Sequence, residues 1–395
     1  MPTVLRRPSE GTPGIITVTH NEALWGVPAV SRRVQSLLTR NANDGRWVYG
    51  VHVQGDCTFL RSWPLHPWQS FVMWPDSDAA FLGNLSSEQR IGLNCINFMP
   101  AEYSTTIDVP AVTDVAVISR PASIKGIRST LEIVHELLTV RTQSNVTIIV
   151  PDPRLWRTRR RAPKGTDMSF FETARRTFTS AQLQRISFVS SSQEAFGQFP
   201  LSQATMIQLL ASSRIVLLNS ESEGTPRALA EGLLLGKPCA VPSILTTGLD
   251  KHLNDSNCLR LPASTREAAV ILSSALGSME FFDVDRTLMR QAFSEAVHVP
   301  MLKKSLSRSF GTAPETSWEL EDLHVRLACH GEKLNYQIMN SEKAFLHWMG
   351  RVEEACQKNL TMDEDYLFPP DRPMDKPRFR TPVVRQVGRL RRRLR

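Results

Sequence analysis

The chain has little cysteine, and the cysteines it has are scattered. No two of them form a C-x-x-C pair, and they stand at positions 57, 95, 239, 258, 329 and 356. Zinc sites and disulfide frameworks need cysteines at close and regular spacings. The sequence therefore argues against both and predicts reduced, unpaired thiols.

Long apolar runs are also missing. No run reaches the roughly 18 residues that a membrane-spanning helix needs, and residues 1–14 hold charge and proline but no apolar core of a signal peptide. We therefore expect a cytoplasmic location. No internal repeat is visible, and no Gly-x-Gly-x-x-Gly follows a predicted strand, which argues against a dinucleotide-dependent dehydrogenase.

What the chain does have is enough material for two cores. It contains 395 residues, of which 41% are hydrophobic, as in ordinary globular proteins. A chain of this length normally divides into two domains. Apolar runs alternate with helical patterns along much of it, and this alternation favours α/β domains built on parallel sheets.

One stretch near the middle of the chain organises the rest. Ile215–Leu218 is an apolar run typical of a buried strand, 219–226 is a loop, and Arg227–Leu235 consists of good helix formers. Pro226 precedes the helix, where its missing N–H costs nothing, and Gly236 stands at the C-cap. Free amides and the helix dipole at such a loop favour phosphate binding.

Two carboxylates flank the turn that starts the helix. Glu223 lies in the loop before the helix, and Glu231 lies about one turn inside the helix, with seven residues between them. An acid beside a phosphate repels it, so both side chains are better suited to accepting hydrogen bonds from sugar hydroxyls. The alternative is an ordinary strand–loop–helix unit with two solvated glutamates.

This stretch resembles the retaining glycosyltransferases of the GT-B fold, especially glycosyltransferase family 4. The family pattern is Glu-Gly-x-Pro, four residues, Glu, then Gly-x-Pro. The resemblance implies that Glu223 contacts the transferred sugar and Glu231 the nucleotide ribose. It also implies a donor-binding role for the residues between them. These are Gly224, Thr225, Pro226 and Arg227, while Gly232 departs from the family's usual Ala.

A second motif, which is basic, precedes this stretch by about a hundred residues. Val115–Ile118 is predicted to be a strand, Ile127–Leu138 a helix with apolar residues at helical spacing, and Arg120 and Lys125 lie on the loop between them. In the resembling family an Arg-x-x-x-x-Lys pair at this place neutralises the diphosphate of the leaving nucleotide. Two solvated cations are the alternative, but the order of the two motifs along the chain matches the family.

The N-terminal part reads as a smaller α/β domain. Its predicted strands are Ile15–Val18, Trp47–Val53, Phe71–Met73 and Gly92–Phe98, with a helix over 28–38. Ligands of doubly wound sheets sit at the carboxyl ends of strands. His20, Asn21 and Gly26 follow the first strand and are therefore candidate acceptor-side residues, although a strand-end hydrogen bond and a plain turn also account for them.

The remaining segments complete a four-part organisation. Further strands are predicted over 146–150, 186–189 and 239–241, and helices over 204–212, 266–276, 284–293 and 318–360, with a connector over 305–314. The loop 190–193 lies where the family holds the nucleotide base. We predict an acceptor domain over 1–109, a donor domain over 110–300, bracing helices over 301–360 and a basic tail over 361–395.

Two further polar segments have open interpretations. Asp76-Ser77-Asp78 has the spacing of a metal-binding Asp-x-Asp, but it lies in turn-rich sequence, and the GT-B resemblance calls for no metal or other cofactor. The second segment is a basic loop, which suits an anionic acceptor, a membrane surface or plain solvent. Its cations are Arg157, Arg159, Arg160, Arg161 and Lys164.

The C-terminal tail carries the charge of the chain. Residues 376–395 hold nine Lys or Arg and no acid, which exceeds the net charge of +8, so the rest is close to neutral. Apolar residues at 383, 387, 390 and 394 fall on one helical stripe. The pattern favours contact with an anionic membrane surface, at about 1 kcal/mol per cation near it. A solubilising tail or a partner-docking helix are alternatives, and nucleic acid is not expected.

Together these patterns predict a GT-B enzyme that moves a sugar from a nucleotide-sugar donor to a hydroxyl acceptor, with retention. Cell-surface glycan or polysaccharide synthesis is the expected setting, with a lipid-linked or glycan acceptor and peripheral contact at the inner face of the membrane. The alternative is a nucleotide-sugar-binding or scaffolding subunit of a polysaccharide assembly complex.

Overall fold

The structure of the chain is a computed structural model, and most of the sequence is described by it. The described residues are 2–20, 23, 32–53, 57, 60–76, 78–105, 109–151, 167–190, 201–221, 223–328, 342–362 and 367. The chain divides into one compact unit over 1–346 and a second over 347–395. Of the second unit the described part is mainly the end of helix α13 (Glu342–Lys358).

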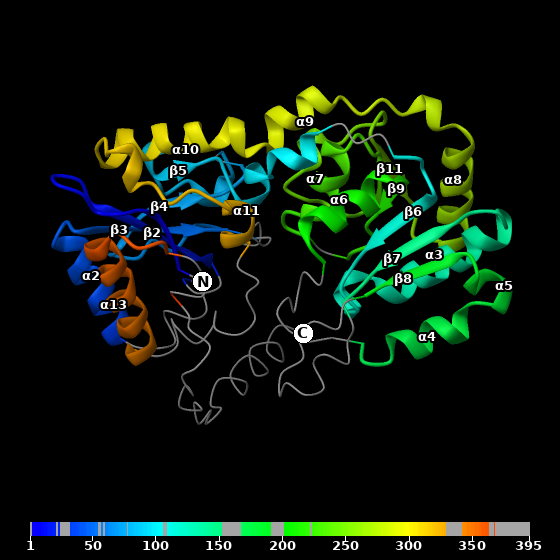
Figure 1. Cartoon of the computed structure of the whole chain (residues 1–395), viewed down its shortest axis with the longest axis horizontal. Helices are drawn as coiled ribbons and strands as arrows, with labels where there is room; N and C mark the ends of the chain where they lie inside the picture. The colour runs from blue at the N-terminus through cyan, green and yellow to red at the C-terminus, as the bar shows by residue number, and fades with distance from the viewer. Residues whose placement is uncertain are drawn as a thin grey trace. The chain divides into compact units, whose positions relative to one another are not determined.

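The N-terminal part contains a five-stranded sheet, whose strands pair in the order β1-β2-β3-β4-β5. Figure 1 shows this part at the blue end of the colour scale. Strand β1 runs antiparallel to β2, and β2 to β5 run parallel. Helix α2 (Arg32–Asn43) lies between β2 and β3 along the chain. The strands are β1 (Thr3–Arg6), β2 (Gly14–Thr19), β3 (Trp47–His52), β4 (Gln69–Met73) and β5 (Arg90–Ile91).

The second sheet has six strands, all parallel, in the order β11-β10-β9-β6-β7-β8. The chain starts in the middle, builds outward to β8, then returns to β9 beside β6, which is the strand order of a doubly wound Rossmann-like domain. Its strands are β6 (Thr113–Ile118), β7 (Val146–Ile149), β8 (Ile186–Val189), β9 (Ser213–Leu217), β10 (Cys239–Pro242) and β11 (Cys258–Leu261).

Helices pack against the second sheet through stripes of apolar side chains. In α3 (Ile127–Val140) the expected stripe, Ile127, Leu131, Val134 and Leu138, is buried. It packs with α8 (Thr265–Gly277) in one core cluster. The other helices of this part are α4 (Phe170–Thr177), α5 (Ser180–Leu183), α6 (Gln203–Ala211), α7 (Arg227–Leu234) and α9 (Arg286–Phe293).

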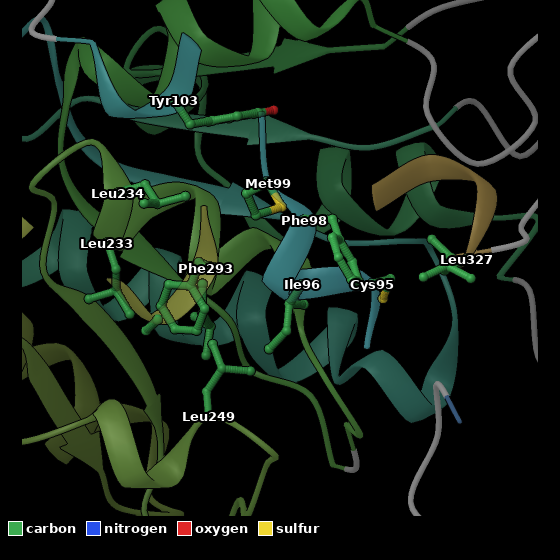
Figure 2. Packing of buried hydrophobic residues seen from close by; sticks show 14 of the residues in the cluster. Cys95, Ile96, Phe98, Met99, Tyr103, Leu233, Leu234, Leu249, Phe293 and Leu327 are labelled. Atoms are coloured by element: carbon green, nitrogen blue, oxygen red, sulfur yellow. The ribbon is translucent and has the colours of Figure 1, made fainter. Parts of the chain in front are cut away.

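A second core cluster joins the two sheets. Figure 2 shows part of it, with side chains from the segment 95–103 beside Leu233, Leu234 and Phe293. The cluster also reaches Leu5 and Phe71 of the first sheet. Both sheets therefore share apolar packing within the first unit.

The segment that follows α9 ties this unit together. Helix α10 (Glu295–Phe310) ends near the first sheet, where the Phe310 ring lies 5.8 Å from that of Phe71. Trp318 forms an isolated antiparallel β-bridge with Arg6 of β1. Arg326 of α11 (Leu323–Arg326) donates to the carbonyl of Val4.

Two sequence expectations were wrong. Gly92–Phe98 is not a strand, since β5 ends at Ile91 and Cys95–Phe98 is the 3-10 helix η4. The Asn94 side chain accepts from the amide of Ile96, and the Asn94 amide donates to the Asn97 side chain, so these two asparagines hold the segment in a 3-10 turn.

The second error concerns the connector over 305–314. Helix α10 continues to Phe310 although it contains Pro300, because His298, Leu302 and Leu306 bury one continuous stripe. The domain limits themselves stay predictions: the two sheets occupy 3–91 and 113–261, and α10, α11 and α13 lie in the segment expected to brace them.

The sequence also gave no warning of the short strands β1 and β11. Within the described part of the chain, five cysteines are free thiols, as expected, and no helix is long and apolar enough to cross a membrane.

Candidate functional site

The two predicted motifs meet at the carboxyl edge of the second sheet. Strands β6 and β9 are neighbours there, so the loops that leave them run side by side. The Glu221 amide donates to the Ile124 carbonyl at 3.1 Å, and the Asn219 side chain donates to the Ser129 hydroxyl at 2.9 Å. This is the point where the strand order reverses, which is where doubly wound sheets bind ligands.

Gly126 makes the close approach of these loops possible. Its φ is +58°, a left-handed conformation that side chains disfavour. A Cβ atom added at Gly126 would lie 1.8 Å from the carbonyl oxygen of Asn219. Only glycine fits at this joint, so residue 126 fixes how near the first motif lies to the second.

Lys125 and Glu223 form an ion pair across this joint. The Lys125 Nζ lies 2.6 Å from Glu223 Oε1, and the two side chains are 17% and 13% exposed. The buried Ser220 hydroxyl donates to the same oxygen at 2.6 Å. A cation and a carboxylate expected to act on neighbouring parts of one donor are therefore in direct contact.

Arg120 lies on the same loop but outside this pair. Its backbone carbonyl accepts from the amide of Ala122 at 2.7 Å, and the residue is partly exposed. Among the residues that the structure describes, no hydrogen bond or ion pair of its side chain is found. The structure thus joins Lys125 directly to Glu223.

The turn between the two glutamates has the expected form. Pro226 is the N-cap residue of α7, and Gly236, with φ of +75°, closes its C-terminus. The amides of Gly236 and Lys237 donate to the carbonyls of Leu233 and Gly232, the bonds of a Schellman motif. Helix α7 is therefore held at both ends.

A loop that follows β10 packs onto this turn. The Gly248 amide donates to the Gly224 carbonyl at 2.6 Å, and a Cβ on Gly248 would lie 3.0 Å from the Thr225 side chain. At Gly232, where the family usually has Ala, a Cβ would lie 2.8 Å from Val216 Cγ2. The departure at residue 232 thus allows α7 to approach β9 closely.

Glu231 lies deeper than Glu223 and is also paired. Its side chain is 4% exposed, and Oε1 lies 2.9 Å from Arg227 Nε, one helical turn earlier. The Tyr103 hydroxyl donates to the same oxygen at 3.2 Å. Burial, with the charge of Glu231, raises the pKa of Tyr103, so its hydroxyl stays protonated.

His324 of α11 adds a neutral imidazole near this cluster. Burial, and secondarily the charge of Arg227, lowers the pKa of His324 to about 4. Protonating it at neutral pH would place a second cation near Arg227 in a dry environment. The group formed by Arg227, Glu231 and His324 therefore holds one cation, Arg227, and one anion, Glu231.

On the first sheet, His20 follows β2 and is buried. Burial lowers the pKa of His20 to about 4, so its imidazole is neutral at pH 7. His52, which ends the neighbouring strand β3, bonds to the Thr17 hydroxyl at 3.1 Å and has its pKa lowered mainly by burial. Asn21 and Gly26 lie outside the described residues.

The remaining polar segments singled out in the sequence are a possible metal-binding turn, two loops and the basic tail. The Asp78 amide donates to the Asp76 side chain at 3.1 Å, which is a local turn. Within the described residues no cluster of three metal-ligating side chains is found. The basic loop over 155–164, most of the proposed base-binding loop over 190–193 and the tail 376–395 lie outside the described residues.

Four residues of these sites were not predicted from the sequence, and they differ in whether any sequence feature could have indicated them. Tyr103 and His324 come from distant segments and carried no local signal. Ser220 precedes Glu223 by three residues, a spacing that allows a side-chain bond. His52 ends a strand parallel to the one that precedes His20, so the pairing of those strands could have indicated it.

Comparisons with known proteins agree with this architecture. No protein-family model matches the sequence, and no curated protein matches it. The crystal structure of HepE from Anabaena in complex with UDP and glucose superposes on 70% of this chain and 76% of HepE, with 16% identity and a TM-score of 0.50. The pneumococcal O-GlcNAc transferase GtfA, in complex with UDP and GlcNAc, matches over 69% of this chain and 54% of its own, with 12% identity and a TM-score of 0.45.

At these identities the likeness concerns the fold. Two mostly parallel α/β sheets, of which the second has the doubly wound order, match the HepE structure over most of both chains. The α/β prediction and the prediction of two Rossmann-like domains are confirmed. In fold, the chain has the GT-B architecture of two Rossmann-like domains.

Proposed function

We propose that this protein is a retaining glycosyltransferase, similar to family 4, that moves a sugar from a nucleotide-sugar donor to a hydroxyl acceptor. The observation that carries the proposal is the meeting of Lys125 with Glu223 at the switch point of the second sheet. Two motifs 98 residues apart contribute one side chain each to a shared spot. Two merely solvated charges would not require the glycine joint that brings them together.

The chemistry needs stabilisation of the leaving group most. A departing nucleoside diphosphate gains negative charge, which preorganised cations and amides stabilise. Lys125 and Arg120 would supply the cations, and the turn through Gly224 and Thr225 at the start of α7 the backbone dipoles. Glu223, held by Ser220, would exchange part of its present bonding for hydroxyls of the transferred sugar.

The remaining donor roles are those that the family resemblance implies, and the acceptor role is proposed from position at a strand end. Glu231, with Pro226 and Arg227 beside it, would contact the nucleotide ribose. On the acceptor side, a neutral His20 is able to accept a hydrogen bond from an acceptor hydroxyl, and Asn21 and Gly26 remain proposed with it. Because HepE is described with UDP and glucose, UDP-sugars are the first donors to test. The proposed mechanism uses no metal, so EDTA should leave transfer unchanged.

The deciding experiment replaces Lys125 by Ala and measures sugar transfer and donor hydrolysis. Loss of one such charge stabiliser costs on the order of 10²–10³ in kcat. Lys304, an exposed lysine on α10, provides the matched control, since Lys304→Ala should leave turnover unchanged. Near-normal turnover of a folded Lys125→Ala protein would refute the proposed role.

The same assays test the alternative of a binding or scaffolding subunit. Such a subunit would bind a nucleotide-sugar, visible as a thermal shift with UDP-, GDP- or ADP-sugars, without transferring or hydrolysing it. Saturation at a hundredfold over the dissociation constant stabilises a protein by about 2.7 kcal/mol. Binding with no turnover against any acceptor would favour that alternative.

For the tail we propose contact with the inner face of the membrane. Removing residues 376–395 should abolish salt-sensitive co-sedimentation with vesicles rich in phosphatidylserine, because those residues hold nine cations and no acid. Unchanged sedimentation of the truncated protein would contradict this. A setting in cell-surface glycan or polysaccharide synthesis is proposed on the same basis.

A further inference from the structure

Tyr103 reaches the proposed donor site from the segment between the two sheets. It belongs to the 3-10 helix η5 (Ala101–Ser104), and the residue is 2% exposed. In Figure 2 it lies at the edge of the apolar side chains that include Leu233 and Leu234. Its hydroxyl donates to Glu231 Oε1, the oxygen that Arg227 also contacts.

The backbone that carries Tyr103 is held in place from α9. The Arg286 guanidinium donates to the carbonyls of Ser104 and Thr105 at 2.9 and 3.0 Å, and to that of Leu234 at 3.1 Å. Arg290 also donates to the Ser104 carbonyl. Cations at the end of η5 thus fix it against α7, the helix that bears Glu231.

These contacts leave Glu231 with a defined orientation. Both of the bonds above go to Oε1, and a carboxylate accepts up to about four hydrogen bonds. The hydroxyl of Tyr103 remains a donor because its pKa is raised, chiefly by burial. An ionised carboxylate, held on one oxygen by two fixed donors, presents its remaining lone pairs in a fixed direction, which suits the two hydroxyls of a ribose.

We propose that Tyr103 is a positioning residue that orients Glu231 to recognise the ribose hydroxyls of a nucleoside diphosphate. This inference rests on the proposed function, since it assumes that the site takes a nucleotide-sugar. It adds a residue that lies outside both motifs. It also predicts a selectivity: ribonucleotides are preferred over their deoxy counterparts, and Tyr103 is needed for that preference.

The test measures binding of UDP, GDP and ADP, and of the 2′-deoxy and 3′-deoxy forms of the diphosphate that binds best, to the full chain. Hydrogen bonds to charged groups are worth about 10-fold or more in affinity. The wild type should therefore prefer the ribonucleotide by about 10-fold. Tyr103→Phe should lose most of that preference, weakening the ribonucleotide about 10-fold and the deoxy form about 2-fold or less. Donor KM should rise with kcat nearly unchanged.

Tyr49→Phe is the matched control. Tyr49 is a buried tyrosine of β3 whose hydroxyl accepts a hydrogen bond from the Asn41 side chain, in the first sheet. The ribose preference should survive in Tyr49→Phe. If Tyr103→Phe does not fold, Arg290→Gln loosens the same segment from an exposed position and should reduce the preference by about 3-fold, part of the value of one such bond.

The outcomes separate the two ideas. A folded Tyr103→Phe protein that keeps the wild-type ratio, or that weakens both nucleotides equally, overturns the positioning role and leaves the proposed function standing. A wild type that binds none of the three diphosphates overturns the proposed function and the inference with it.

Discussion

The two glutamates of the second domain form two different kinds of ion pair. Glu231 pairs with Arg227 one turn away on the same helix, whereas Glu223 pairs with Lys125 from a loop 98 residues earlier. The local pair is the more buried, with Glu231 4% exposed against 13% for Glu223. A pair within one helix depends only on helix geometry, while the distant pair depends on which strands are neighbours. Each can therefore be broken by a different change.

The largest effect should come from the distant pair. Glu223→Ala should reduce sugar transfer by about 10²–10³, because the proposed polar contact to the reacting sugar would be lost. The control is Glu221→Ala, an exposed acid on the same loop. Steady-state kinetics with the preferred donor measures both. Equal turnover of the two variants would show that Glu223 has no special role.

The local pair should matter more for stability. Arg227→Met leaves the buried Glu231 carboxylate without its cation, which costs about 3 kcal/mol of unfolding free energy. The exposed pair Glu354–Lys358 has the same spacing, so Lys358→Met should cost less than about 0.5 kcal/mol. Urea unfolding compares the two, and adding Glu231→Gln to Arg227→Met should recover part of the loss. Equal costs at the two sites would contradict a burial effect.

The joint beneath the distant pair should also be sensitive. Gly126→Ala places a Cβ against the Asn219 carbonyl in a left-handed conformation, at a cost of about 2 kcal/mol. Gly277→Ala is the control, since a Cβ there meets nothing within 4 Å. The free energy of unfolding and the turnover rate should both fall in Gly126→Ala, and neither should fall in Gly277→Ala. A Gly126→Ala protein with full stability would show that the two loops are able to separate freely.

The smallest expected effect is the pH dependence of stability that His324 causes near the Arg227–Glu231 pair. The pKa of His324 is about 4 in the folded protein, below its ordinary value of 6.5, so between these values the unfolded state binds more protons. Stability is therefore full above pH 6.5 and falls as pH drops toward 4. His324 should account for about 2 kcal/mol of the loss between pH 7 and pH 5, and His20 contributes in the same direction.

His324→Gln should remove that part of the slope. The measurement is the free energy of unfolding of both proteins at pH 7 and pH 5. A variant with the wild-type slope would place the pH dependence elsewhere.

Local features of the fold were readable from the sequence. The stripe of α3, the caps of α7 and the paired carboxylates follow from residue spacing alone, because helix periodicity and cap chemistry act within a few residues. The same local reasoning failed at 92–98, where asparagine side chains hold a 3-10 helix instead of a strand, and at 305–314, where helix α10 continues to Phe310 instead of a connector. Tyr103 gave no signal, because its partner is 128 residues away.

By itself the sequence predicted which residues would carry the proposed chemistry: two acids around a helix-starting turn, and a cation on an earlier loop. Only the tertiary structure decided that Lys125 and Glu223 touch, since their contact requires β9 to return beside β6 and a glycine to let the loops close. It also decided that Glu231 is held by Tyr103, because side chains far apart along a chain are brought together only by the packing of the whole core.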